Sequence, residues 1–165
     1  MAEGEFALVR EHIEAALTRP SLGWATFGDH DLYSLLADAA AQQRDEAALQ
    51  EYVTLAEETA RRYNHRLYQA VAHRAWGVLH RLAGQYTESQ LRLTQALELF
   101  QQFDTYWQIG RTLYELGEVD LSCAENQDAR EHFTQSLAAF ERIGAVPDAT
   151  RVHEKLTTII KEKMQ

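Results

Sequence analysis

The sequence predicts an all-α fold, a right-handed α-solenoid of antiparallel helix pairs with about eight helices. Strong helix formers such as alanine, leucine, glutamate and glutamine are plentiful, while the 165 residues include only two prolines and eight glycines. Apolar residues recur at helical spacing. One arrangement of large and small residues returns every 40 positions, as from Val53 to Leu93 to Phe133, which is typical of a stacked repeat.

The repeat consists of five columns of equivalent residues. In one helix of each unit, a large apolar residue is followed three positions later by a small one: Ile13 and Ala16, Val53 and Ala56, Leu93 and Ala96, Phe133 and Ser136. In the other helix the columns are Leu36, Trp76, Leu116 and Leu156, followed by the small residues Ala37, Gly77 and Gly117. Each unit ends on an apolar residue and a turn former, at Tyr63-Asn64, Phe103-Asp104 and Ile143-Gly144. Small side chains allow antiparallel helices to cross closely, so each unit is predicted to be a packed helix pair.

Helices are expected, in chain order, at 5–18, 30–42, 45–62, 66–83, 86–102, 106–123, 126–142 and 147–163. The connections between them are short, which makes sequential helices antiparallel neighbours. The exception is residues 19–28, RPSLGWATFG, which we expect to be a loop held by Trp24 and Phe27. Pro147 suits the first turn of the last helix.

We expect a single domain over residues 1–165. It would contain an unpaired N-terminal helix at 5–18, repeats at 29–64, 69–104 and 109–144, and a capping helix at 147–163 that ends in the polar residues KEKMQ. The first helix aligns with the second helix of a repeat, with no partner before it. It is therefore either a cap or part of an array that is longer in the parent protein.

The segment AWGVLHRLAGQYTESQLRLTQALELF resembles a tetratricopeptide repeat. The family's small residues, Gly-polar-aromatic turn and second-helix positions correspond to Gly77, Gly84, Tyr86, Ser89, Leu93 and Ala96. The next unit matches at Gly117, Ala129, Phe133 and Ser136 but has Asn126 in place of the aromatic residue, and the 29–64 unit is the weakest, with Arg44 and Leu49 in place of glycine and alanine. The 40-residue spacing resembles the long repeats in sensor arms of large bacterial signalling ATPases and transcription activators.

The resemblance implies a protein-interaction scaffold whose first helices line a concave groove. The family's ligand-contacting positions gather five residues on that face: Arg74, Arg81, Arg111, Tyr114 and Arg151. Since arginine forks suit carboxylates, we expect a groove for an acidic segment or the C-terminal carboxylate of an extended peptide. Alternatively, these arginines pair with Glu115, Glu118 and Glu154, or cover apolar surface with their stems.

Other classes of function are less well supported. The net charge of −9 argues against a nucleic-acid ligand, and no apolar run is long enough to span a membrane. No Walker, GxSxG, HExxH or dinucleotide motif occurs, so we expect neither an enzyme nor a cofactor. His73 and His80 are expected to be packing or surface residues rather than metal ligands. The single cysteine, Cys123, is expected to be a small, partly buried residue, and together with an N-terminus unlike a secretory signal it predicts a cytoplasmic protein.

Two further functions stay open. The chain could self-associate as a homodimer through a terminal helix or through the aromatic residues Trp24, Phe27 and Trp107. It could instead be a small-molecule-sensing regulatory domain of a larger bacterial signalling protein, with the ligand held near Tyr114 and Trp107.

Overall fold

The computed structural model describes residues 8, 10–15 and 29–162, and all regular structure in those residues is helical. Its labelled helices are α2 (Asp29–Gln43), α3 (Glu46–Arg62), α4 (Arg66–Leu82), α5 (Tyr86–Gln102), α6 (Tyr106–Ser122), α7 (Asn126–Arg142) and α8 (Val146–Glu162). Each begins and ends within one residue of its prediction. The rest of the predicted 5–18 helix and the loop with Trp24 and Phe27 lie outside the described residues.

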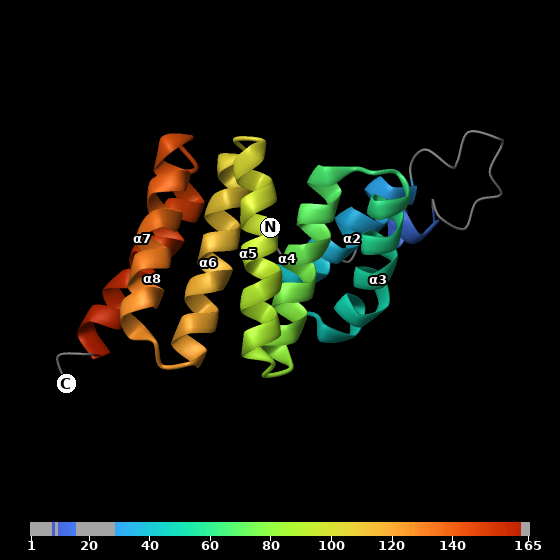
Figure 1. Ribbon diagram of the computed structural model, residues 1–165. Coiled ribbons are helices and arrows are strands. Elements are labelled where there is room, and N and C mark those ends of the chain that lie inside the picture. The colour runs from blue at the N-terminus through green and yellow to red at the C-terminus, as the bar shows by residue number, and fades with distance from the viewer. Residues whose placement is uncertain (1–7, 9, 16–28, 163–165) are drawn as a thin grey trace.

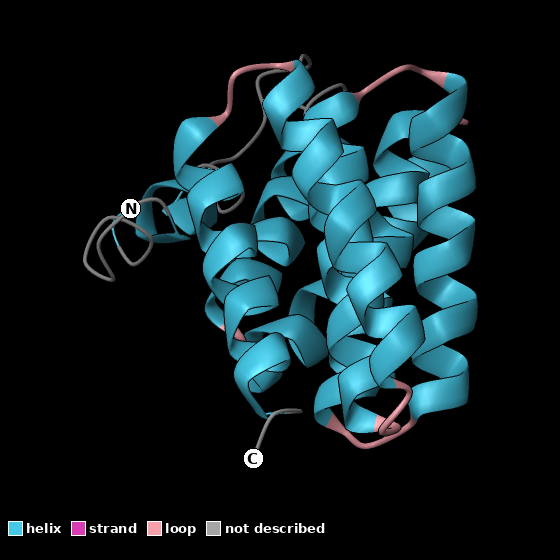
Figure 2. Ribbon diagram, turned by 90° about the vertical axis from the view of Figure 1, so that its left-hand side faces the viewer, coloured by secondary structure: helices cyan, strands magenta, loops and turns pink. Residues whose placement is uncertain are grey.

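The helices form a solenoid of antiparallel pairs, which confirms the predicted fold class. In Figure 1 they stand side by side along one axis, from α2 and α3 at one end to α7 and α8 at the other. In the side view of Figure 2, the connections lie at the two ends of the helices. Each helix packs on the next along the chain, and α4 also contacts α2 and α6. The helices α2, α4, α6 and α8 therefore form one row, and α3, α5 and α7 the other.

Uniform element lengths account for the 40-residue period. From α3 onward each helix has 17 residues. The connections 63–65, 83–85, 103–105, 123–125 and 143–145 have three residues each. Two such helices and two such connections thus make 40 residues. Equivalent residues of successive units consequently face the same neighbours.

Each connection is a Schellman turn, in which one residue has a positive φ. These residues are Arg44, Asn64, Gly84, Asp104, Ala124 and Gly144, at φ 50–73°. In the 83–85 turn, Gln85 N donates to His80 O at 2.8 Å and Gly84 N donates to Arg81 O at 3.0 Å. Ala124 makes the same bonds at φ 61°, although alanine rarely adopts this conformation. The turn is therefore imposed by the packing of the helices as well as by its own residue.

Exchanging glycine and alanine in two of these turns is expected to have opposite effects. Ala124→Gly should raise the free energy of unfolding by about 0.5–1 kcal/mol, because it removes the strain at φ 61°. Gly84→Ala should lower it by about 1 kcal/mol through backbone strain alone, since a Cβ at Gly84 meets no atom within 4 Å. Urea denaturation measures both, and changes of the same sign would contradict this account.

The small residues lie at helix crossings, as the sequence predicts. A Cβ placed on Gly77 would lie 2.5 Å from Cγ of Leu93, and one on Gly117 would lie 2.8 Å from Cζ of Phe133. The buried hydroxyl of Ser136 donates to the carbonyl of Gly110 at 2.7 Å, where another glycine is crowded by Phe140. The large residue of one helix therefore packs directly against the small residue of its partner helix in each of these repeats.

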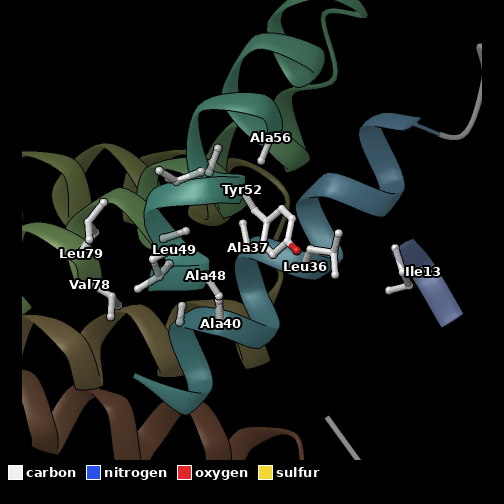
Figure 3. Packing of buried hydrophobic residues seen from close by; sticks show 14 residues of the cluster. Ile13, Leu36, Ala37, Ala40, Ala48, Leu49, Tyr52, Ala56, Val78 and Leu79 are labelled. Atoms are coloured by element: carbon white, nitrogen blue, oxygen red, sulfur yellow. The ribbon is translucent and has the colours of Figure 1, made fainter. Parts of the chain in front are cut away.

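The apolar core runs along the stack between the two rows. Its first part, shown in Figure 3, places Tyr52 and Leu49 of α3 near Leu36 and Ala37 of α2. The helical residues 10–15 join this part through Ile13, which is buried. The hydroxyl of Tyr52 also donates to Glu14. These N-terminal residues therefore cover the end of the core beside α2 and α3.

Candidate ligand site on the inner face

The row of first helices is the inner side of the solenoid. Two ion pairs join α2 and its C-terminal turn to α6, which are separated in the row by α4: Asp38 with Arg111 at 2.9 Å, and Arg44 with Glu115 at 2.7 Å. Side chains can bridge over the intervening α4 only if the row curves toward them. The sequence prediction that first helices line the concave side is consistent with this geometry.

Asp38 is the centre of the first ion-pair cluster. One carboxylate oxygen accepts from Nη2 of Arg74 at 2.7 Å and the other from Nη1 of Arg111 at 2.9 Å. The side chain of Arg74 is only 1% exposed, its Nη1 donates to the carbonyl of Gln108 at 3.4 Å, and its guanidinium lies over the ring of Phe100. The side chain of Arg74 therefore lies beneath the surface of the inner face. Its charge is balanced by the Asp38 carboxylate inside the protein.

In the Asp38 cluster, the carboxylate and the guanidiniums stabilise each other's charged forms against the effect of burial. Burial is the largest influence on the pKa of Asp38 and raises it, but the guanidiniums of Arg74 and Arg111 together lower it to about 2. Burial, followed by the neighbouring Arg111, lowers the pKa of Arg74 to about 10, while Asp38 opposes that change. Both groups are charged near neutral pH. The cluster thus binds α2, α4 and α6 electrostatically.

A pH dependence of stability follows from the lowered pKa of Asp38. Its carboxylate is preferred in the folded state, so its contribution is complete above the usual value of 3.8 and is lost as the pH falls toward about 2. The pKa difference corresponds to about 2 kcal/mol. Between pH 5 and pH 3, the native chain should therefore lose more unfolding free energy than Asp38→Asn does. Parallel losses in the two proteins would contradict this.

Glu115 of α6 is the centre of the second cluster. Its Oε2 accepts from Nη1 of Arg44 at 2.7 Å and from Nη2 of Arg81 at 3.3 Å. Arg44 occupies the positive-φ position after α2, and this turn brings its side chain to α6. Arg44, which replaces the glycine of the repeat pattern, therefore links the turn after α2 to α6 on the inner face.

A third group of polar contacts joins α6 to α8. Nε1 of Trp107 donates to Asp148 at 3.1 Å, and Nη2 of Arg151 lies 3.5 Å from the same carboxylate. The guanidinium of Arg151 lies over the ring of Tyr114, and that of Arg111 lies over Trp107. Arg151 has a side chain that is 53% exposed, so its guanidinium is open to solvent.

These three groups enclose a polar cavity of about 240 Å³ between α2, α6 and α8. It is lined by Gln42, Arg44, Trp107, Arg111, Glu115, Asp148 and Arg151. Three arginines from separate parts of the chain thus converge on one hollow. Guanidiniums in this arrangement can bind an anion by forked hydrogen bonds.

The structure separates the five residues that the sequence places in the groove. Arg111 and Arg151 line the cavity, Tyr114 lies beneath Arg151, and Arg81 is held by Glu115 at the margin. Arg74 is buried away from it. Sequence reasoning missed Arg44 and Asp148, and it proposed Glu115, Glu118 and Glu154 as the internal partners without Asp38. Of these, Glu115 is a partner of two arginines, whereas Glu118 pairs with Lys155.

The histidines and the cysteine considered from sequence lie outside this cavity. His73 contacts Nη1 of Arg92 at 2.9 Å, and burial, followed by that guanidinium, lowers its pKa. His80 stacks on Trp76 and contacts Gln85, so both histidines have roles in packing. Cys123 is exposed rather than partly buried as expected, because it lies at the end of α6 beside the turn.

Comparisons with known proteins support a helical-repeat fold. The chain is similar to the crystal structure of aspartyl phosphate phosphatase F from Bacillus subtilis, with a TM-score of 0.69 and 17% identity over 93% of this chain and 41% of that one. It is also similar to BtubC (BKLC) from P. vanneervenii, with a TM-score of 0.61 and 16% identity over 98% of this chain and 75% of that one. This chain thus spans less than half the length of the phosphatase.

The sequence comparisons add no family. No family model matches the chain, and no curated protein matches it. At 16–17% identity, the structural similarities show the fold only. The ligand must be inferred from the residues of the site. Among the described residues, no helix combines the length and apolar character needed to cross a membrane.

Proposed function

We propose that the chain is a tetratricopeptide-type interaction module that binds an acidic protein segment on its inner face. The observation that carries the proposal is the cavity where Arg44, Arg111 and Arg151 meet in a chain of net charge −9. An acidic protein that gathers arginines on one concave surface presents a local positive potential there. The helical-repeat fold supports the proposal, since stacked helix pairs create extended concave binding surfaces.

The proposed role is binding rather than catalysis, and we place it in the cytoplasm. The charged side chains of the inner face are arranged as ion pairs around a polar hollow, which suits recognition of an anion. An exposed thiol at Cys123 is compatible with a reducing compartment. We further propose, from the 40-residue repeat length, that the module is part of a signalling protein.

The proposal predicts that Arg44→Glu with Arg151→Glu strongly weakens binding of acidic segments. Peptides selected from a random display library against the native chain should be enriched in Asp, Glu or a free C-terminus, and the double variant should bind them at least about tenfold more weakly. These two arginines are chosen because neither is fully buried, so the fold should survive their exchange.

The matched control is Arg62→Glu, which changes an exposed arginine at the end of α3, a helix that does not line the cavity. Circular dichroism confirms helicity, and isothermal titration calorimetry gives the affinities. Selected peptides that bind native chain, control and double variant equally would contradict the proposed site.

Self-association is a second candidate function, supported by an exposed apolar row. Tyr63, Phe103 and Ile143 follow α3, α5 and α7 at 40-residue intervals, and all three are exposed. Exposed apolar residues in register can form an interface between copies. Light scattering of the native chain beside Phe103→Ser tests this: a dimer that dissociates in the variant supports it, and a native monomer excludes it.

A further inference from the structure

We propose that the cavity between α2, α6 and α8 is a phosphoryl site, which takes the phosphorylated side chain of a bound protein segment. The inference rests on the proposed function and specifies the group that the segment presents. Its volume of about 240 Å³ is below the roughly 300 Å³ at which pockets for drug-sized ligands begin. A cavity of this size suits one polar side chain.

The charge of the surrounding cluster favours a doubly charged group. The linked cations are Arg44, Arg74, Arg81, Arg111 and Arg151, and the linked carboxylates are Asp38, Glu115 and Asp148. Five positive and three negative charges leave +2 over the whole linked network, and the five charged residues that line the cavity itself contribute +1 of this. A carboxylate would neutralise half of the network charge. A phosphoryl group carries about −1.5 to −2 at pH 7 and would neutralise nearly all of it.

The arginines that line the cavity have donors to spare. Within the described residues, Arg44 and Arg111 make their hydrogen bonds through Nη1 only, and Arg151 approaches Asp148 through Nη2 only, at 3.5 Å. A guanidinium has five N–H donors in a planar fork. The second terminal nitrogen of each of the three remains for a ligand. Three free terminal nitrogens match the three oxygens of a phosphoryl group better than the two of a carboxylate.

The carboxylates at the cavity are held in ways that reduce their repulsion of an anion. Glu115 is neutralised by Arg44 and Arg81, and Asp148 accepts from Trp107. The 3.5 Å contact between Arg151 and Asp148 is loose, and Arg151 is the most exposed of the three arginines. Arg151 can therefore turn toward an entering phosphoryl group while Trp107 keeps its bond to Asp148.

The Trp107 indole provides a direct readout. In nuclear magnetic resonance spectra of the ¹⁵N-labelled chain, its Nε1–H signal reports on the cavity. The signal of Trp76, which donates to Glu57 away from it, serves as an internal reference. The probes are inorganic phosphate, N-acetyl-O-phosphoserine amide and N-acetyl-aspartate amide, titrated at constant ionic strength. Trp107→Phe assigns the signal.

Both phosphoryl probes should shift the Trp107 signal and leave that of Trp76 in place, with at least tenfold tighter binding than the aspartate probe. Arg44→Gln with Arg151→Gln should weaken phosphoserine binding at least tenfold, and Arg62→Gln should not change it. Because the second phosphoryl pKa is near 6, phosphoserine binding should also weaken from pH 7.5 to pH 5.5, while the aspartate probe changes little.

Equal binding of the aspartate and phosphoserine probes would overturn the phosphoryl assignment and leave the acidic-segment function intact. A shift with free phosphate but not with phosphoserine would also overturn it, since the ion would then bind without a protein segment. No shift with any probe would overturn it as well. The display-selected peptides would then decide the proposed function separately.

Discussion

Replacing Asp38 with asparagine is expected to lower the free energy of unfolding by about 3 kcal/mol or more. The substitution leaves the Arg74 guanidinium charged, 1% exposed and without its carboxylate. It also removes the ion pair from Arg111 of α6. Losing one partner of a buried pair costs much more than losing a surface pair, because the remaining charge stays desolvated. Urea denaturation at pH 7 measures the change.

Asp148→Asn is the matched control for this experiment. It also removes a carboxylate paired with an arginine of the inner row, but Arg151 is exposed and 3.5 Å away, and the new amide oxygen can still accept from Trp107. Its cost should stay below about 1 kcal/mol. Equal costs for the two substitutions would show that Asp38 acts as a surface residue and that the inner row is held by apolar packing alone.

The fold was predictable because each repeat is specified by features that lie close together in the sequence. A 17-residue helix and a three-residue turn recur with constant length, so equivalent residues such as Leu93 and Phe133 stay in register over the whole array. The crowding of Gly77 and Gly117 was predictable for the same reason, because a small residue at a helix crossing has one dominant physical cause.

The turns show that the identity of a single residue does not always predict its backbone conformation. Gly84 and Gly144 suit a positive φ, and Asn64 tolerates it, but Arg44 and Ala124 adopt the same conformation without such a signal. In these two turns, packing of the flanking helices overrides the preference of the residue. A repeat period therefore predicts the turn conformation better than the identity of a single residue does.

The inner face could be predicted only in part, because its contacts depend on curvature. The repeat columns place Arg74 and Arg111 on equivalent helices but cannot show that both meet Asp38 of α2. The pairs of Asp38 with Arg111 and of Arg44 with Glu115 join residues 73 and 71 positions apart, nearly two repeats. A small change in the rotation between repeats would separate them. The choice between a ligand-binding arginine and an internally paired one is thus made by tertiary geometry.

Introducing a single methyl group at Gly117 is expected to cost about 2 kcal/mol in unfolding free energy. The new Cβ would lie 2.8–2.9 Å from Cζ, Cε1 and Cε2 of the buried Phe133 ring, which cannot bend away as a flexible chain can. The helices α6 and α7 must then separate at their crossing. Chemical denaturation of Gly117→Ala measures this cost, and Gly84→Ala distinguishes it from the effect of turn strain.

A double-mutant cycle identifies the contact that causes the loss. Phe133→Ala removes all three ring atoms that the new Cβ of Gly117→Ala would meet, whereas leucine would not serve, because Leu93 crowds the equivalent Gly77 at 2.5 Å. In a Phe133→Ala background, Gly117→Ala should therefore cost less than about 1 kcal/mol, giving a favourable coupling of about 1 kcal/mol or more. Strict additivity would show that the Phe133 ring does not cause the loss, and the small columns of the repeat would then reflect something other than close helix crossing. Helix propensity cannot explain a loss, because alanine is a better helix former than glycine.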